Sequence, residues 1–425
     1  MTAQSGLSSG CPEYQHLSRR SFFRQFGTGA MAASLPAWMP TVRFASAEDS
    51  TRDVIISVFL RGGADGLSLV APFADAAYYR LRPTLAIPRP DSSSPSRGTA
   101  LDDRFMLPPA MQPLLAPYRA GDLLVVHAAG QQYTKSRSHF EAERYLEQGK
   151  PEDYLLQSGW LARHLALTPP LDPDASLRAI SLSYGMPYTL IGAPRTLSMT
   201  RPDLFQINTP SELALQRLYG SAWAPLRDSA MDGLGTANML RMLDFDGYQP
   251  ANGARYADSN FARAIKSVAV LLKGDVGLEA AHIDLTAWDT HANQGVISGA
   301  MQMLMAELAG GLAAFWQDVM QGNQTTRVTL VVTTEFGRNV RENGSLGTDH
   351  GRASVMFVMG RAIAGGRVLT EWPGIEREEL EDGQDLRVTI DTRDVLAEIV
   401  QRRLGNRHLS VVFPDYLPRF RGVTR

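Results

Sequence analysis

The chain has 425 residues, of which 44% are hydrophobic and 20% are charged, and its formal net charge is −2. These values are ordinary for a soluble globular protein and exclude an intrinsically disordered chain. The near balance of charges also gives no electrostatic basis for binding nucleic acid, so we expect no such partner.

An export signal is predicted at the N-terminus. The pair Arg19 and Arg20 is followed by a weakly apolar stretch, 26–39, and then by the small residues 45–47, a layout typical of a twin-arginine signal with its cleavage site. The stretch is shorter than the ~20 apolar residues of a membrane-spanning helix. We expect residues 1–47 to be removed, the twin-arginine export machinery to be a partner, and the mature chain to have no stable membrane span. Its predicted location is the periplasm or cell envelope.

The cysteine content limits the chemistry of any metal site. Cys11 is the only cysteine, and it lies inside the predicted signal. The mature chain would therefore have no thiolate, and a metal ion would have to be held by His, Asp, Glu and similar ligands.

Strands and helices alternate along the rest of the chain, which favours an α/β fold with a mostly parallel central sheet and helices on both faces. We expect residues 48–425 to form a single domain, in which about 200–274 is a mostly helical insertion. Ligands of such sheets bind at the carboxyl ends of the strands. The expected strands are 53–60, 123–127, 177–183, 280–285, 327–333 and 355–359, and the expected helices are 138–148, 296–320 and 392–404.

Two candidate motifs follow the first two predicted strands. Gly62 and Gly63 allow a tight turn and a close approach to an ion, and Asp65 offers a hard oxygen ligand, although an ordinary glycine turn would look the same. Ser138 stands at the predicted start of a helix. It is either an N-cap or a nucleophile, and in the second case Arg137 would pair with an anionic substrate.

Histidines and carboxylates also gather at the later strand ends. Asp289 and His291 follow the strand 280–285 and stand two positions apart, so that both side chains can point to one side of an extended loop. The repeated coincidence favours a shared centre. The candidate metal ligands are Asp65, Asp289, His291, Glu335, Asp349 and His350, with His139 as a supporting residue.

Several of these motifs occur together in a known family. In this order, RGGADGL (61–67), SRSHFEAERYLEQG (136–149), WDTHANQ (288–294) and TTEFGRNVRENGSLGTDHG (333–351) resemble the bacterial exported family called domain of unknown function 1501. That family is placed in the alkaline phosphatase and sulfatase superfamily. The resemblance covers nearly all of the mature chain. It implies an alkaline-phosphatase-like fold and a metal-dependent hydrolase that cleaves phosphate or sulfate esters.

The resemblance also implies roles for the candidate residues. One or two divalent ions (Zn, Mn, Mg or Ca) would be bound by the six ligands named above, Ser138 would attack an anionic ester substrate, and Arg137 and Arg338 would bind the anion. Two features depart from the phosphatases of the superfamily: the close Asp-x-His spacing at 289–291, and Phe336 where those enzymes have a histidine. They put a second metal in doubt. The alternative is a non-catalytic exported protein that binds a metal or an envelope component on the same fold.

Overall fold

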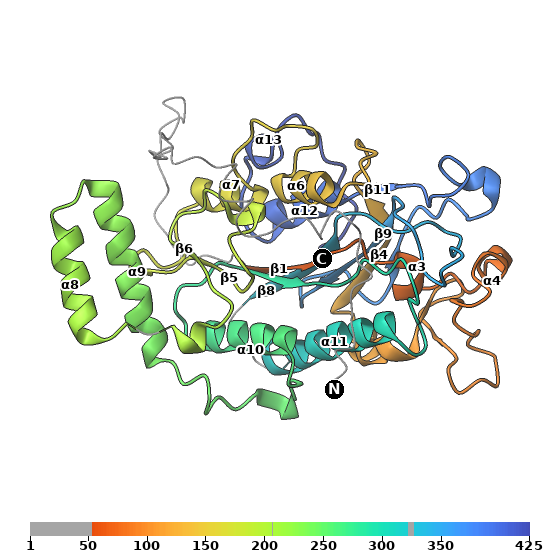
Figure 1. Ribbon diagram of the computed structural model, residues 1–425, viewed down its shortest axis with the longest axis horizontal. Coiled ribbons are helices and arrows are strands. Elements are labelled where there is room, and N and C mark those ends of the chain that lie inside the picture. Colours follow the sequence, from red (N-terminus) through yellow and green to blue (C-terminus); the bar gives the residue numbers. More distant parts are fainter. Residues whose placement is uncertain (1–52, 206, 322–326) are drawn as a thin grey trace, which may run out of the picture.

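A single large sheet forms the centre of the molecule (Figure 1). The computed structural model describes residues 53–205, 207–321 and 327–425, and in these ranges nine strands pair in the order β10-β4-β9-β8-β1-β7-β5-β6, with β11 beside β4. The predicted signal, 1–47, lies outside the described residues. The strands are β1 (Val54–Leu60), β4 (Leu123–Gly130), β5 (Ala179–Ser181), β6 (Thr196–Ser198), β7 (Ala280–Leu285), β8 (Val328–Thr334), β9 (Ser354–Met359), β10 (Val368–Leu369) and β11 (Ile390–Asp391).

Most neighbouring strands run parallel, which confirms the predicted α/β class with a mostly parallel central sheet. The exception is β9, which is antiparallel to both of its neighbours, β4 and β8. A parallel connection needs a crossover, usually a helix, but the residues between β8 and β9 contain no helix. The chain instead turns back at the end of β8. Residues just before β9 therefore lie at the same edge of the sheet as residues just after β8.

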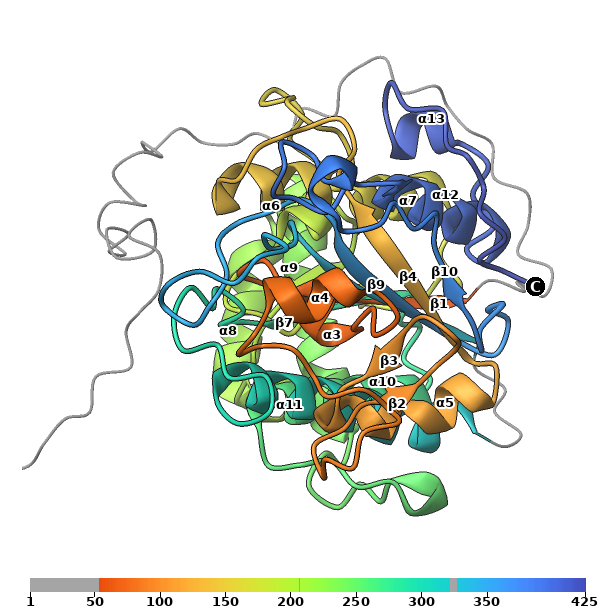
Figure 2. The same ribbon diagram turned by 90° about the vertical axis from the view of Figure 1, so that its right-hand side faces the viewer.

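Helices cover both faces of the sheet (Figures 1 and 2). On one face lie α10 (Asn260–Lys273) and α11 (Ala300–Phe315), and on the other lie α6 (His139–Gln148), α7 (Trp160–Leu167), α12 (Thr392–Arg402) and α13 (Leu409–Val412). The helix predicted at 296–320 is α11, which ends in a π-helical turn, Trp316–Met320.

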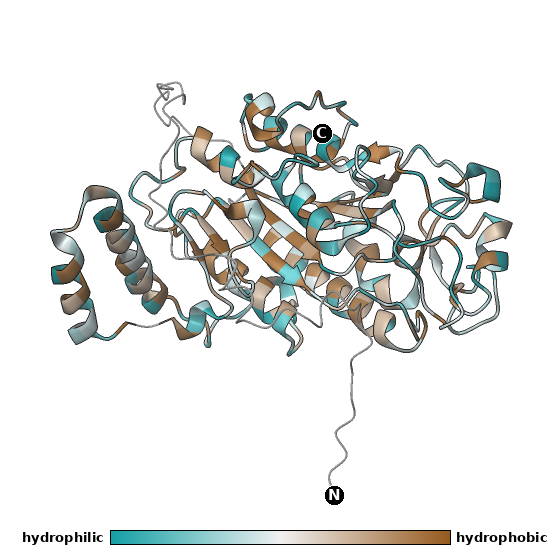
Figure 3. Ribbon diagram, turned by 45° about the horizontal axis from the view of Figure 1, so that its top comes forward, coloured by the Kyte–Doolittle hydropathy of each residue, from teal (hydrophilic) through white to brown (hydrophobic). Residues whose placement is uncertain are grey.

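Strand β1 shows why these segments fold together. Val54, Ile56 and Val58 face the core formed with α10 and α11, whereas Ile55 faces the core formed with α7 and α12. Because successive side chains of a strand point to opposite faces, a strand buried on both sides reads as a continuous apolar run. Figure 3 shows this as apolar residues concentrated in the sheet.

The predicted helical region 200–274 divides into two parts. Helices α8 (Thr209–Gly220) and α9 (Ala224–Met242) form a pair that stands away from the sheet at one end of the molecule, whereas α10 packs against the sheet (Figure 1). In the described ranges, no helix has both the length and the apolar character required to cross a membrane. The remaining short elements are α3 (Gly66–Leu69), α4 (Ala76–Leu81), α5 (Leu115–Arg119) and the two-stranded β2 (Thr99–Ala100) and β3 (Met106–Leu107).

Candidate metal centre

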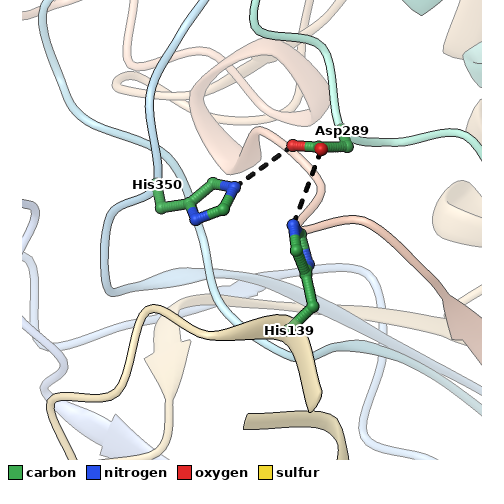
Figure 4. A group of neighbouring side chains, drawn as sticks. All are labelled: His139, Asp289 and His350. Atoms are coloured by element: carbon green, nitrogen blue, oxygen red, sulfur yellow. Dashed lines mark hydrogen bonds and ion pairs between the residues drawn. The ribbon is translucent and has the colours of Figure 1, made fainter. Parts of the chain in front are cut away.

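Three imidazoles and one carboxylate converge at the carboxyl edge of the parallel strands. His139 is the first residue of α6, which follows β4, and Asp289 and His291 lie in the loop after β7. His350 precedes β9, and its backbone pairs with Arg338 in an antiparallel bridge. Figure 4 shows the imidazoles of His139 and His350 directed at the Asp289 carboxylate.

The backbone at the end of β1 allows this convergence. Gly62 has a φ of 120°, and a Cβ atom at this position would lie only 2.5 Å from the backbone nitrogen of Asp289. The Gly62 N–H donates to Glu335 Oε1 at 2.7 Å. Only glycine leaves room at this position for the backbone of Asp289. The predicted glycine turn therefore lets the loops after β1, β7 and β8 lie against one another.

Each of the three imidazoles is held from outside through Nδ1. The acceptors are Glu335 Oε1 for His139 (2.9 Å), Asp349 Oδ1 for His291 (3.0 Å) and the Arg137 carbonyl oxygen for His350 (2.8 Å). A carbonyl oxygen only accepts, so His350 Nδ1 carries the proton; ionised carboxylates impose the same tautomer on the other two rings. The neutral rings therefore carry their lone pairs on Nε2.

All three Nε2 atoms face Asp289. Nε2 of His291 and of His350 lie 3.0 and 3.2 Å from Asp289 Oδ1, and Nε2 of His139 lies 3.6 Å from Asp289 Oδ2. Nε2 of His291 is also 3.0 Å from Nε2 of His350. In neutral rings these contacts set lone pair against lone pair, which is unfavourable unless a proton or a metal cation lies between them.

The close contacts between the histidines and Asp289 shift the pKa values of these groups. Burial by itself would lower the pKa of His139, but hydrogen bonds with Asp289 and Glu335 raise it to about 9. The hydrogen bond to Asp289 likewise raises the pKa of His291. Burial opposes ionisation of Asp289, yet the surrounding histidines and Arg338 hold its pKa far below the usual range. The cluster therefore has a strong affinity for positive charge.

The predicted ligands Glu335 and Asp349 do not face Asp289 but contact the outer nitrogen, Nδ1, of His139 and His291. Glu335 is buried, and its Oε2 accepts from the Thr334 hydroxyl at 2.9 Å while its Oε1 contacts His139. Asp349 accepts from Asn343 at 3.1 Å as well as from His291. Both carboxylates thus orient a histidine, which is how acidic residues around metal-bound histidines commonly act.

Arg338 does not have the predicted substrate-binding geometry. It is buried, and its guanidinium donates to the Gly63 oxygen at 2.7 Å, to the Thr348 oxygen at 2.8 Å and to Asp289 Oδ1 at 2.6 Å, and also to the Gly62 oxygen. With its donors directed at the protein, Arg338 clamps the loops after β1 and β7 rather than binding an external anion.

Asp65 also lies outside the cluster. Its carboxylate is buried, with Arg82 donating to both oxygens at 2.5 and 3.0 Å, and Ser68 and Gln294 donating to Oδ2 at 2.6 and 2.7 Å. Although burial acts in the opposite direction, Arg82 holds the pKa of Asp65 below its usual value. This carboxylate is engaged in a buried ion pair, so we do not include it among the ligands.

Ser138 and Arg137 flank the cluster without joining it through their side chains. Ser138 is the N-cap position of α6 but makes no side-chain capping hydrogen bond. Arg137 contributes its carbonyl oxygen to His350, while its guanidinium pairs with the buried carboxylate of Asp385. Both the backbone and the side chain of Arg137 are therefore engaged within the protein.

Phe336, which directly follows Glu335, packs on the cluster. Its ring centroid lies 5.0 Å from that of His139 and 4.7 Å from that of His350. Across the part of the chain that the structure describes, His139, Asp289 and His350 form the group that could hold a metal ion, with ligand atoms within 4.8 Å of one another. The geometry therefore provides one centre rather than two.

The comparison with protein families agrees with the motif order. The profile of a family described as "Protein of unknown function (DUF1501)" matches residues 52–414. The chain belongs to this family. The match includes every residue of the cluster and confirms the family resemblance predicted from the motifs. None of the curated proteins compared with the chain matches it.

His139 has a more central place than the sequence predicts. It is predicted as a supporting residue, yet in the structure it is one of the three converging imidazoles. The available signal is its place at the start of the helix that follows the second buried strand, at the same sheet edge as the other family motifs.

Proposed function

We propose that this member of the family binds one divalent metal ion through His139, Asp289 and His350, with His291 as a fourth ligand, and uses it to hydrolyse a phosphate or sulfate ester. The observation that carries the proposal is the shared arrangement of the imidazoles, each held through Nδ1 and turned with Nε2 toward one carboxylate. Nitrogen and carboxylate ligands of this kind suit Zn²⁺, Mn²⁺ and similar ions.

The distances between the ligand atoms fit a single ion. Two ligand atoms that each lie about 2.0–2.1 Å from a tetrahedral ion are roughly 3.3 Å apart. The contacts of the three Nε2 atoms with Asp289, at 3.0, 3.2 and 3.6 Å, lie around this value. Acceptors outside the shell, the Glu335 and Asp349 carboxylates and the Arg137 carbonyl oxygen, keep the histidines in the required tautomer.

The site is also open enough for a ligand. The side chains of His291, His350 and Asp289 are 27%, 12% and 10% exposed. A divalent ion held there would polarise an ester oxygen and favour the ionised form of a nucleophile. Ser138 remains the proposed nucleophile, because it adjoins His139 and its hydroxyl makes no capping hydrogen bond to α6.

The motif order and the N-terminal sequence support two further parts of the proposal. We place the fold in the alkaline phosphatase and sulfatase superfamily, and we assign the protein to the periplasm or cell envelope through twin-arginine export. The first rests on the resemblance of strand-end motifs, and the second on Arg19, Arg20 and the small residues at 45–47.

A second candidate is a non-catalytic metal-binding protein. It is favoured by the commitment of Arg338 and Asp65 to contacts within the protein and by the inward-facing ligand atoms of His139, Asp289 and His350, which lie within 4.8 Å of one another. In this case the ion would stabilise the strand-end loops without chemistry.

Metal analysis of natively exported protein tests the proposal. We expect about one divalent ion per chain in the wild type and in the control Asp246→Asn, and none in Asp289→Asn. Chelation should lower the melting temperature of the wild type but leave Asp289→Asn unchanged, because a ligand bound only to the folded state stabilises it. A wild type without metal after native export would refute the centre.

Hydrolysis of aryl phosphates and aryl sulfates then separates the two candidates. Catalysis by the metal-loaded wild type that is lost in Ser138→Ala supports the hydrolase with its nucleophile. Activity that survives Ser138→Ala refutes the nucleophile assignment. A metal-loaded protein that is inert toward every ester favours the structural metal site.

A further inference from the structure

A polar cleft of about 540 Å³ opens beside the candidate metal centre. Asp349 and Asn343, which form part of its lining, also belong to the support of His291. The cleft therefore lies on the outer side of the Asp349 carboxylate, whereas Nε2 of His291 faces the centre. The other charged residues of the lining are Arg80, Arg341, Glu342, Glu376 and Arg377.

The acidic residues that line this cleft are already engaged. Glu342 accepts from the backbone nitrogens of Thr84 and Leu85 at 3.1 and 3.0 Å, and Glu376 pairs with Arg80 at 2.5 Å. Asp349 is held by His291 and Asn343, as described above. None of these carboxylates is directed at the two remaining arginines.

Arg341 and Arg377, in contrast, are exposed and form no ion pair with any residue that the structure describes. The lining as a whole is balanced, with three arginines and three carboxylates, but the guanidinium donors of Arg341 and Arg377 are not engaged by any of these carboxylates. Guanidinium groups bind carboxylate, sulfate and phosphate groups through paired N–H donors, so two of them at one cleft suit an anionic ligand.

A neighbouring cavity differs from the cleft in this respect. It has a volume of about 360 Å³ and shares Gln384 with the cleft. Its basic residues are all paired: Lys135 and Arg352 lie 3.0 and 3.3 Å from Glu381, and Arg137 pairs with Asp385. Of these two cavities, the first is the one whose lining includes arginines without an ion pair to a described residue.

We propose that the cleft lined by Arg341 and Arg377 binds a second anionic group of an extended substrate, whose ester lies at the metal centre. This rests on the proposed function and specifies its substrate class. A ligand that occupies both places must reach past the imidazole of His291, which a simple monoester cannot do. The substrate is therefore an oligomeric anion that carries carboxylate, sulfate or phosphate groups at intervals along its length.

Equilibrium titration of the mature chain tests this inference without relying on catalysis. The probes are trigalacturonate, a polysulfated disaccharide and tripolyphosphate, each titrated into wild type with and without added Zn²⁺ and into Asp289→Asn. We expect at least one probe to bind in all three samples, and the one that binds most tightly identifies the anionic group. Absence of binding by all three would overturn the proposal.

Matched variants locate the site. The double substitution Arg341→Ala, Arg377→Ala should weaken binding of the probe by at least about 10-fold, since it removes the charged hydrogen-bond donors of both guanidinium groups. Arg407→Ala is the control, because it removes an exposed arginine near Arg403, whose carbonyl oxygen accepts from Asp53 at the opposite edge of the sheet. Equal affinity in the double variant and the wild type would refute the site.

The same measurements keep the two proposals apart. If the metal centre is absent, Asp289→Asn and the wild type are both free of metal, but the probes still bind through the arginines. If the cleft does not bind anions, metal content and ester hydrolysis are unaffected by the double variant while no probe titrates.

Discussion

Three histidines of the cluster differ in sequence context but share one chemical arrangement. His139 is held by Glu335, His291 by Asp349, and His350 by a backbone carbonyl oxygen. In each ring an acceptor at Nδ1 fixes the tautomer and leaves Nε2 facing inward. The outer acceptors therefore decide whether the inner atoms can bind a cation.

Glu335→Gln tests this role at the level of one residue. The substitution preserves shape but removes the charge that supports His139, so we expect affinity for the metal ion to fall about 10–100-fold while the fold is retained. Competition with a chelating indicator measures the affinity. Glu378→Gln, at an exposed position, is the control and should match the wild type. An unchanged affinity in Glu335→Gln would contradict the assignment of Glu335 as the orienting residue.

At the scale of elements, the site depends on loops that Arg338 holds together. Its guanidinium reaches the carbonyl oxygens of Gly63, after β1, and of Thr348, before β9, together with the Asp289 carboxylate after β7. The antiparallel return of β9 makes this possible, because it brings Thr348 and His350 to the same sheet edge. One buried side chain thus links three strand ends.

Arg338→Lys should loosen these loops although the charge is kept. An ammonium group cannot reproduce the planar set of donors, so buried carbonyl oxygens would lose their partners. We expect the free energy of unfolding to fall by about 2–3 kcal/mol and metal affinity to fall with it. Urea denaturation of the metal-free protein gives the first quantity. Arg407→Lys serves as the exposed control, and an equal stability of the two variants would exclude a clamping role.

At the scale of the whole molecule, the core contains a histidine that makes folding sensitive to acid. His127 on β4 is fully buried: its Nε2 lies 2.9 Å from the Val70 oxygen, and its Nδ1 accepts from the Ala128 N–H at 2.8 Å. Burial lowers the pKa of His127 to about 4. Protonation of Nδ1 would break its hydrogen bond with the Ala128 N–H and place a charge in the buried core. The ring is therefore neutral in the native state.

The pH dependence of global stability follows from that shift. The folded pKa lies below the unfolded value of about 6.5, so stability is complete above this pH and is lost as the pH falls toward 4, by about 3 kcal/mol in all. His127→Gln should remove this component and give a flatter profile. The check is urea denaturation of metal-free protein between pH 7 and 4.5, with exposed His408→Gln as the control. Parallel profiles for His127→Gln and the wild type would contradict the prediction.

Much of the fold could be predicted from local pattern. The strand expected at 280–285 is β7 with the same bounds, and those expected near 53–60 and 327–333 are β1 and β8. Their apolar runs are long enough to signal burial on both faces. The short strands β6, β10 and β11 went unpredicted, because two or three residues carry no periodicity that a sequence can display.

The sequence by itself determined the α/β class, the family and the placement of the candidate polar residues at strand ends, because hydrophobic periodicity and glycine-rich turns act over a few neighbouring residues. Only the tertiary structure decided which polar side chains meet. It brought His139 into the cluster, moved Glu335 and Asp349 to its outer support, and committed Asp65 and Arg338 to buried contacts. Residue types and spacing cannot separate a ligand from the group that orients it, since the same carboxylate serves either purpose. Which carboxylate faces the centre and which orients a histidine depends on the antiparallel direction of β9 and on how the loops after β1, β7 and β8 meet.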